Sequence, residues 1–200
     1  VRPARPELPI CEAFLEAAAA SGYPVLEDLN RDTVDGFGYY DINVARGRRM
    51  STARSYLNPA KGRENLTVVP EAQALWLNVE NGRAVGAEIS IHGRLQTIQA
   101  GREIVISCGA IKSPQLLMLS GVGPTDQLNA LGIPVQHDAP RVGQGLQNHV
   151  CYRPQYVCNA PVTASGQTEP WNVLKAMARY AVSRTGPFAE SYAPAGGFFR

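Results

Sequence analysis

A short apolar run followed by a turn of small residues constrains the fold of this chain more than any other feature. Residues 103–107 read Glu-Ile-Val-Ile-Ser, which is typical of a buried strand, and the turn Cys108-Gly109-Ala110 follows directly. Ser113 and Pro114 then predict the N-cap and the first residue of a helix that runs to Leu119. This order predicts an α/β unit whose side-chain-poor turn lets a flat or phosphorylated ligand come close. Plain strand–helix packing produces the same pattern, so this unit alone does not decide between the two interpretations.

Three short segments ahead of this unit predict a small antiparallel meander. They are residues 74–79, 84–90 and 96–100, which are rich in alternating apolar residues. Asn81-Gly82 and His92-Gly93 lie between them and are typical of tight hairpin turns.

Apolar spacing and helix-breaking residues predict the remaining elements. We expect helices over 8–20, 50–57, 125–131 and 171–183, with Pro59 stopping the second, and strands over 39–44, 65–69 and 195–200. The run VGQGLQNH at 142–149 contains two glycines, but it does not follow an apolar strand and lacks a third glycine, so we interpret it as a loop.

Composition excludes several classes of function. The net charge is only +2 and the basic residues are scattered, which argues against a nucleic-acid partner. The sequence has no apolar stretch of about 20 residues, the length that a membrane-spanning helix needs. The four cysteines and three histidines show no metal-ligand spacing, so we expect reduced thiols and no metal. The start at Val1 without an initiator Met predicts an internal piece of a longer protein.

A longer pattern resembles a known family. Residues 109–124, GAIKSPQLLMLSGVGP, resemble at every constrained position the second signature of the glucose–methanol–choline oxidoreductases. The resemblance extends from about residue 14 to residue 200 and includes NLTV at 65–68 and AGGF at 195–198. Gly145 and Asn148 depart from it, because the family usually has Asn and Asp there.

The resemblance implies a mixed α/β fold of two parts. Residues 51–148 would form part of an FAD/NAD(P)-binding-type α/β domain that carries the meander. Residues 1–50 and 149–200 would contribute to an α+β substrate-binding domain.

The resemblance also implies a cofactor, FAD, and residues that contact it. The backbone of Ala74 would hold the adenine, and Ser107, Cys108, Gly109 and Ala110 would line the adenosine–ribose side. No catalytic residue is expected within the chain, because the family's catalytic base and its partner come from a segment beyond Arg200. His149 matches a different motif, for which a structural role is the alternative to a catalytic one.

The activity implied for the intact protein is oxidation of a small-molecule alcohol by hydride transfer to flavin, with oxygen or a quinone as electron acceptor. The chain alone is expected to be inactive. Two alternatives stay open: a binding or interaction module that has lost the flavin, and a nicotinamide-dependent dehydrogenase. A hydrolase is not supported, because the chain has no Gly-x-Ser-x-Gly sequence.

Overall fold

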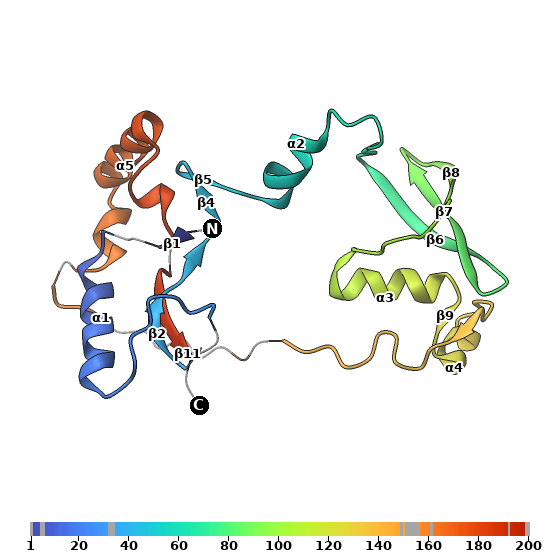
Figure 1. Ribbon diagram of the computed structural model, residues 1–200, viewed down its shortest axis with the longest axis horizontal. Coiled ribbons are helices and arrows are strands. Elements are labelled where there is room, and N and C mark those ends of the chain that lie inside the picture. Colours follow the sequence, from blue (N-terminus) through green and yellow to red (C-terminus); the bar gives the residue numbers. More distant parts are fainter. Residues whose placement is uncertain are drawn as a thin grey trace. The chain divides into compact units, whose positions relative to one another are not determined.

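The chain folds into two compact units. The computed structural model describes residues 2–4, 7–31, 35–148, 150, 157–160, 162–191 and 193–198. Unit 1 comprises Val1–Leu66 with Pro154–Arg200, and unit 2 comprises Thr67–Arg153. Figure 1 labels the elements of both units.

A three-stranded antiparallel meander forms one half of unit 2. Its strands are β6 (Ala72–Glu80), β7 (Arg83–Ile91) and β8 (Arg94–Gln99), in the order β6-β7-β8. Asn81-Gly82 and His92-Gly93 connect them, and all four of these residues have positive φ. Two consecutive positive φ values define the type I′ turn, whose twist matches that of the flanking strands. The predicted meander and both turns are confirmed.

Two helices and a pair of short strands form the other half of unit 2. Helix α3 (Gly109–Leu119) packs against β6. Strand β9 (Val122–Gly123) pairs in parallel with β10 (His137–Asp138), and α4 (Thr125–Ala130) connects them. Leu128 of α4 is completely buried beneath this connection.

Two expectations for unit 2 were wrong. Residues 103–107 do not form a strand, because no other strand in the described part of the chain pairs with this segment, and Val105 is 79% exposed. Helix α3 begins at Gly109 rather than after Ser113, so Pro114 lies inside it. The Oγ of Ser113 accepts a hydrogen bond from the backbone N–H of Cys108 at 3.0 Å. Ser113 therefore satisfies an amide at the helix start from within the helix.

The segment that joins the units also differs from the prediction. Residues 65–69 form no strand, and Val68 and Val69 are each 44% exposed. Pro59 does not stop the preceding helix. The five-residue π-helix η1 (Ala53–Leu57) continues into α2 (Asn58–Ala60), where Pro59 occupies one of the first two helical positions. Proline has no N–H to donate within the helix, and the helical run ends one residue later, at Ala60.

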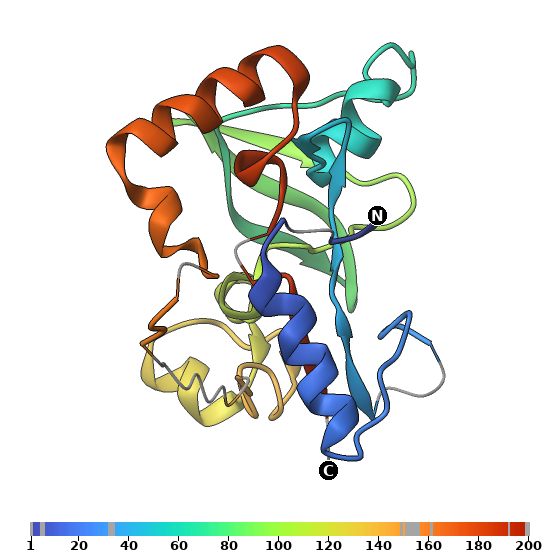
Figure 2. The same ribbon diagram turned by 90° about the vertical axis from the view of Figure 1, so that its left-hand side faces the viewer.

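Unit 1 combines several small antiparallel sheets with two longer helices. Strand β2 (Gly36–Tyr39) pairs with β11 (Ala195–Phe198), and α1 (Pro9–Ala20) lies alongside them (Figure 2). The ring of Phe14 on α1 meets that of Phe37 on β2 edge to face, with 5.6 Å between the ring centroids. The other elements are β1 (Arg2–Pro3), β3 (Asp41–Ile42), β4 (Val44–Ala45), β5 (Arg48–Arg49), η2 (Ala164–Thr168), α5 (Pro170–Ser183) and η3 (Pro187–Ala189).

The predictions for unit 1 are largely confirmed. The helices expected at 8–20 and 171–183 match α1 and α5 to within one residue at each end. The strand expected at 39–44 is present as shorter pieces, β2 to β4, because the chain changes partner from β11 to β1 to β5. The strand expected at 195–200 is β11 as far as Phe198, and the last two residues lie outside the described part of the chain.

Candidate functional site

The turn that leads into α3 is exposed and uncovered. Ser107, Cys108, Gly109 and Ala110 are all exposed. Gly109 has a φ of +86°, and apart from its chain neighbours and the backbone of its own helix, no described atom lies within 4 Å of the position that a Cβ would occupy there. A positive φ favours glycine over any other residue. The backbone is thus held in a glycine conformation and open to a ligand.

The start of α3 offers backbone donors. Its N-cap residue, Cys108, makes no side-chain capping hydrogen bond, and the first turn contains no acidic residue. The first amides of a helix have no partner within the helix and carry a partial positive charge. Oxygen atoms of a ribose or a pyrophosphate are the groups that such amides bind.

Ala74 lies on β6 at an irregularity that the sequence did not predict. Its Cα pairs with that of Ile89, whereas Trp76 pairs with Glu88, so β6 has one more residue than β7 between these pairs. Such a β-bulge leaves the extra residue, here Leu75, without a ladder partner. The Ala74 side chain is exposed. Backbone groups next to Ala74 are therefore not all used by the sheet.

A buried hydrogen bond connects the two parts of this site. The backbone N–H of Leu77 on β6 donates to Ser120 Oγ at 2.8 Å, just after the end of α3. Ser120 is 7% exposed, and its hydroxyl donates to the carbonyl of Leu116 at 2.6 Å. Ala74 thus lies on the strand that packs against α3, the helix whose first residue is Gly109. Ala74 and residues 107–110 are all described, and no hydrogen bond joins Ala74 directly to the turn.

Glu88 is an ionisable group of unit 2 whose pKa depends on its hydrogen bonds. On the meander, Glu88 Oε1 accepts hydrogen bonds from Thr97 Oγ1 at 2.6 Å and from Asn78 Nδ2 at 3.1 Å. These hydrogen bonds hold the pKa of Glu88 below its usual range, with Thr97 making the larger contribution. Both stabilise the charged form, so Glu88 is a cross-strand anchor.

Histidines, cysteines and metal ligands give no further site. The structure describes two histidines. His92 lies at the turn between β7 and β8, with its Nε2 3.6 Å from Glu71 Oε2, and His137 is exposed. Cys11, Cys108 and Cys158 are free thiols, whereas His149 and Cys151 lie outside the described residues. Within the described ranges, no group of three His, Cys, Asp or Glu residues could hold a metal ion. No helix in the same ranges is long and apolar enough to cross a bilayer.

The family model that describes the GMC oxidoreductases matches residues 1–151 of the chain. The chain belongs to the GMC oxidoreductase family. The glucose–methanol–choline resemblance in the sequence is therefore confirmed, and so is the expected mixed α/β fold.

Several GMC relatives are similar over nearly the whole chain. The oxygen-dependent choline dehydrogenase of Pectobacterium carotovorum is 46% identical over 189 residues, which are 94% of this chain and 34% of the relative. The mitochondrial choline dehydrogenase of Homo sapiens is 40% identical over 192 residues, or 96% of this chain and 32% of the relative. The chain thus spans about a third of the length of these relatives.

Solved GMC structures share the fold. A formate oxidase of Aspergillus oryzae superposes with a TM-score of 0.83 at 25% identity, covering 96% of this chain and 33% of that one. Pyridoxine 4-oxidase from Mesorbium loti gives a TM-score of 0.65 at 34% identity, covering 70% of this chain and 27% of that one.

The expected cofactor, FAD, is confirmed at the level of the family, whose N-terminal domain binds FAD. The family match thereby favours flavin over the nicotinamide alternative. The described residues fit such a group, since they supply an uncovered glycine and uncapped helix amides at the same place. The assignment of Ala74, Ser107, Cys108, Gly109 and Ala110 as individual FAD contacts stays a prediction, as does the division into domains at residues 50 and 148.

Proposed function

We propose that the protein is an FAD-dependent oxidoreductase that oxidises an alcohol, and that this chain supplies the wall against which the adenosine half of FAD lies. When bound, FAD accepts a hydride from the carbinol carbon of the alcohol. The contribution of this chain is to bind and orient the cofactor.

The turn at Gly109 is the observation that carries the proposal. Backbone amides at the start of α3 would donate hydrogen bonds to ribose or phosphate oxygens. The missing side chain of Gly109 would let these oxygens approach, since the space above it is open. Ser107, Cys108 and Ala110 would line the same surface. No ionised side chain is needed there, because the amides provide the positive end of the helix dipole.

Ala74 would contribute a second contact through its backbone. Its position at a β-bulge supports this role, because the ladder between β6 and β7 is interrupted there. A contact made through amide and carbonyl groups does not depend on the side chain, so Ala is suitable at this position.

The proton acceptor for the alcohol would lie outside this chain. The two described histidines, His92 and His137, are surface residues, and neither belongs to the turn before α3. The isolated chain should therefore show no turnover, even with FAD added.

The relatives suggest which alcohol and which electron acceptor to test first. Choline is the first alcohol to test, because relatives at 40% and 46% identity are choline dehydrogenases. Oxygen is the first electron acceptor to test, since one of these relatives is described as oxygen-dependent, and a quinone is the alternative.

Anaerobic spectroscopy of the full-length protein tests the proposal. The purified protein should show the absorbance of oxidised flavin, and an alcohol from a panel that starts with choline should bleach it. Restored absorbance on admitting oxygen, or on adding a quinone, would identify the acceptor. A protein that binds no flavin would favour the non-catalytic binding module instead. Bound flavin that no alcohol reduces would contradict alcohol oxidation.

A further inference from the structure

Unit 1 contains a cavity that the proposed cofactor wall does not involve. Its volume is about 770 Å³, which is within the range of small-molecule sites. The start of α1, the turn between β4 and β5, η2, α5 and η3 all contribute to its wall. Four arginines and two glutamates line it: Arg2, Arg46, Arg179, Arg184, Glu7 and Glu190.

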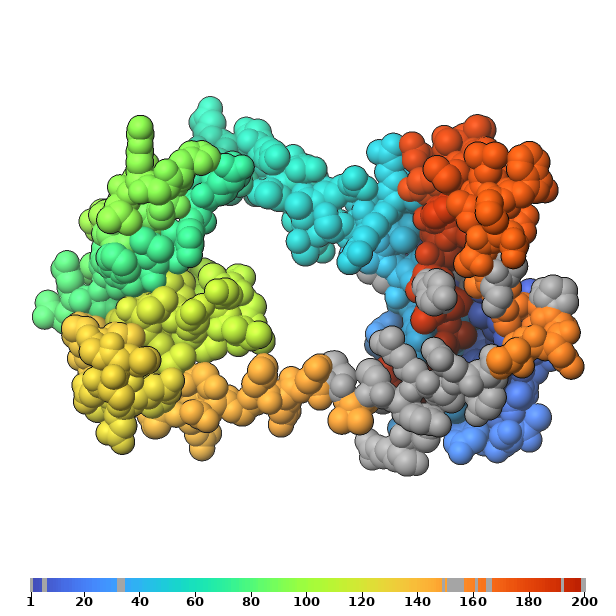
Figure 3. Space-filling view, turned by 180° about the vertical axis from the view of Figure 1, so that it is seen from behind, coloured from blue at the N-terminus to red at the C-terminus, as the bar shows by residue number. Residues whose placement is uncertain are grey.

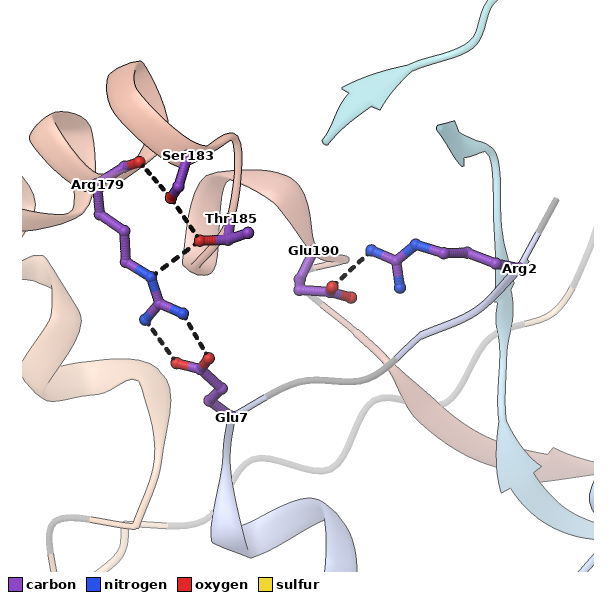
Figure 4. A network of polar contacts seen from close by, with 6 residues as sticks. All are labelled: Arg2, Glu7, Arg179, Ser183, Thr185 and Glu190. Carbon is purple, nitrogen blue, oxygen red and sulfur yellow. Dashed lines mark hydrogen bonds and ion pairs between the residues drawn. The ribbon is translucent and has the colours of Figure 1, made fainter. Parts of the chain in front are cut away.

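Both glutamates are already paired with arginines (Figure 4). Arg179 donates to Glu7 through both terminal nitrogens, at 2.8 and 2.6 Å, and its Nε donates to Thr185 Oγ1 at 3.1 Å. The hydrogen bonds from Arg179 hold the pKa of Glu7 below its usual range, so this carboxylate stays ionised at neutral pH. Arg2 donates to Glu190 Oε1 at 2.6 Å. Two other guanidinium groups on the wall therefore have no carboxylate partner among the residues that the structure describes.

These two groups belong to Arg46 and Arg184. Neither forms an ion pair with a described residue. Arg46 is exposed, and Arg184 is half-buried. The Arg184 guanidinium lies over the ring of Tyr180, 4.9 Å from its centroid, which leaves its edge of N–H donors available.

The backbone holds Arg46 and Arg184 near one another. Tyr180 donates a hydrogen bond from its hydroxyl to the carbonyl of Gly47 at 2.9 Å, and this bond ties α5 to the turn between β4 and β5. A Cβ at Gly47 would overlap the carbonyl oxygen of Arg184, so the two chain segments are in direct contact. Figure 3 shows the orange-to-red segment that contains α5 beside the light-blue segment that contains β4 and β5. Arg46 and Arg184 both have positive φ, at 50° and 56°, a backbone conformation that is uncommon for arginine.

The rest of the wall is suited to an organic molecule rather than to a bare ion. Leu8, Val173, Ala176 and Phe188 provide apolar surface, and Gln167 and Thr168 provide polar groups. Small-molecule sites typically combine an apolar lining with a few converging polar groups.

We propose that this cavity binds a small organic anion, whose carboxylate or phosphate group is held by Arg46 and Arg184. Among its described residues the wall has four guanidinium groups and two carboxylates, an excess of two positive charges. A guanidinium group presents paired N–H donors that match the oxygens of either anion. Glu7 and Glu190 neutralise only Arg179 and Arg2, so an anionic ligand would neutralise the charge of Arg46 and Arg184.

Isothermal titration calorimetry of the full-length protein tests the proposal with two probes, inorganic phosphate and succinate, and with succinamide as the neutral counterpart of succinate. We expect saturable binding of at least one anion and none of succinamide. Arg46→Gln and Arg184→Gln should each weaken binding by at least about 10-fold, since each removes charge-assisted hydrogen bonds to the anion. Arg48→Gln is the matched control, because Arg48 is exposed on the same hairpin but does not line the cavity.

The outcome also identifies the ligand class. Binding of phosphate alone would indicate phosphorylated ligands, and binding of succinate alone would indicate carboxylates. Should Arg184→Gln lower the melting temperature by removing the stack on Tyr180, Arg46→Gln in the exposed turn still provides the test. Absence of saturable binding for both anions would overturn the proposal, and so would equal affinities in the Arg46→Gln and Arg48→Gln proteins.

Discussion

The hydroxyl of Ser120 accepts a hydrogen bond from the backbone N–H of Leu77 at 2.8 Å, although the two residues are 43 positions apart in the chain. Ser120 also donates to the carbonyl of Leu116 at 2.6 Å, so both partners of its hydroxyl are backbone groups. This contact fixes the end of α3 against β6. It thereby orients the helix whose other end carries the proposed FAD contacts.

Replacing Ser120 by Ala should destabilise unit 2. The substitution leaves the buried N–H of Leu77 without a partner, at a cost of about 1–3 kcal/mol. Urea unfolding followed by circular dichroism measures the change. Ser90→Ala on β7 is the control, because the Ser90 side chain forms no hydrogen bond with any residue that the structure describes, and it should shift the free energy of unfolding by no more than about 0.5 kcal/mol. Equal effects of the two substitutions would show that the hydroxyl of Ser120 is not important for stability.

The parts of the fold that local chemistry determines could be predicted from the sequence. Asn81-Gly82 and His92-Gly93 specify type I′ turns, and these turns fix the meander. The strand expected at 103–107 was wrong because a strand needs a neighbouring strand to pair with. The local sequence does not show whether such a neighbour exists. Val105 is 79% exposed for the same reason. The β-bulge at Leu75 likewise depends on pairing with β7, and nothing in the local sequence indicates it.

The ion pair between Glu7 and Arg179 should make the stability of unit 1 depend on pH. The pKa of Glu7 is lowered in the folded chain, mainly by the hydrogen bonds from Arg179. The stabilisation is therefore fully present above the unfolded carboxyl pKa of about 4.3, and it is lost as the pH falls through the lower folded value. Glu7→Gln should be less stable than the unmodified chain at pH 7, and the difference in stability should be smaller at an acidic pH at which Glu7 becomes protonated.

The loss of stability caused by Glu7→Gln at pH 7 should be small, because the side chains of Glu7 and Arg179 are 66% and 45% exposed. Glu16→Gln on α1 serves as the control, since no ion pair of Glu16 is present in the described structure. A difference for Glu7→Gln that is the same at both pH values would rule out an ionic origin.

The cysteines should react with thiol reagents at different rates. Burial is the main cause that raises the pKa of Cys11, and the nearby carboxylate of Glu12 adds to it. Thiolate is the reactive form, so Cys11 should be labelled more slowly than the exposed Cys108 and Cys158. Mass spectrometry after timed alkylation with iodoacetamide measures the order. Labelling of Cys11 as fast as Cys108 in the folded protein would show that the first helix is not packed as described.

For the candidate site, the need for a glycine could be predicted from the sequence, but the position of the helix start could not. Gly109 could be selected from the sequence because a glycine after an apolar run predicts a close approach, and it has the positive φ that requires glycine. The helix start could not be placed, since Ser113 followed by Pro114 is a typical N-terminal pair and yet α3 begins at Gly109. The cavity in unit 1 left no signal in the sequence, because its arginines come from segments far apart in the chain.

FAD binding by Gly109→Ala, compared with Gly132→Ala, tests the central claim most directly. Both glycines have positive φ, at 86° and 69°, and apart from local backbone and chain neighbours neither has a described atom within 4 Å of the Cβ position. The backbone strain of about 1–2 kcal/mol is therefore common to both substitutions, and only Gly109 belongs to the proposed cofactor wall. The measurement is the FAD dissociation constant of the full-length apoprotein, from flavin fluorescence. We predict that Gly109→Ala weakens FAD binding by at least about 10-fold while Gly132→Ala leaves it unchanged; equal dissociation constants for the two variants would contradict the account.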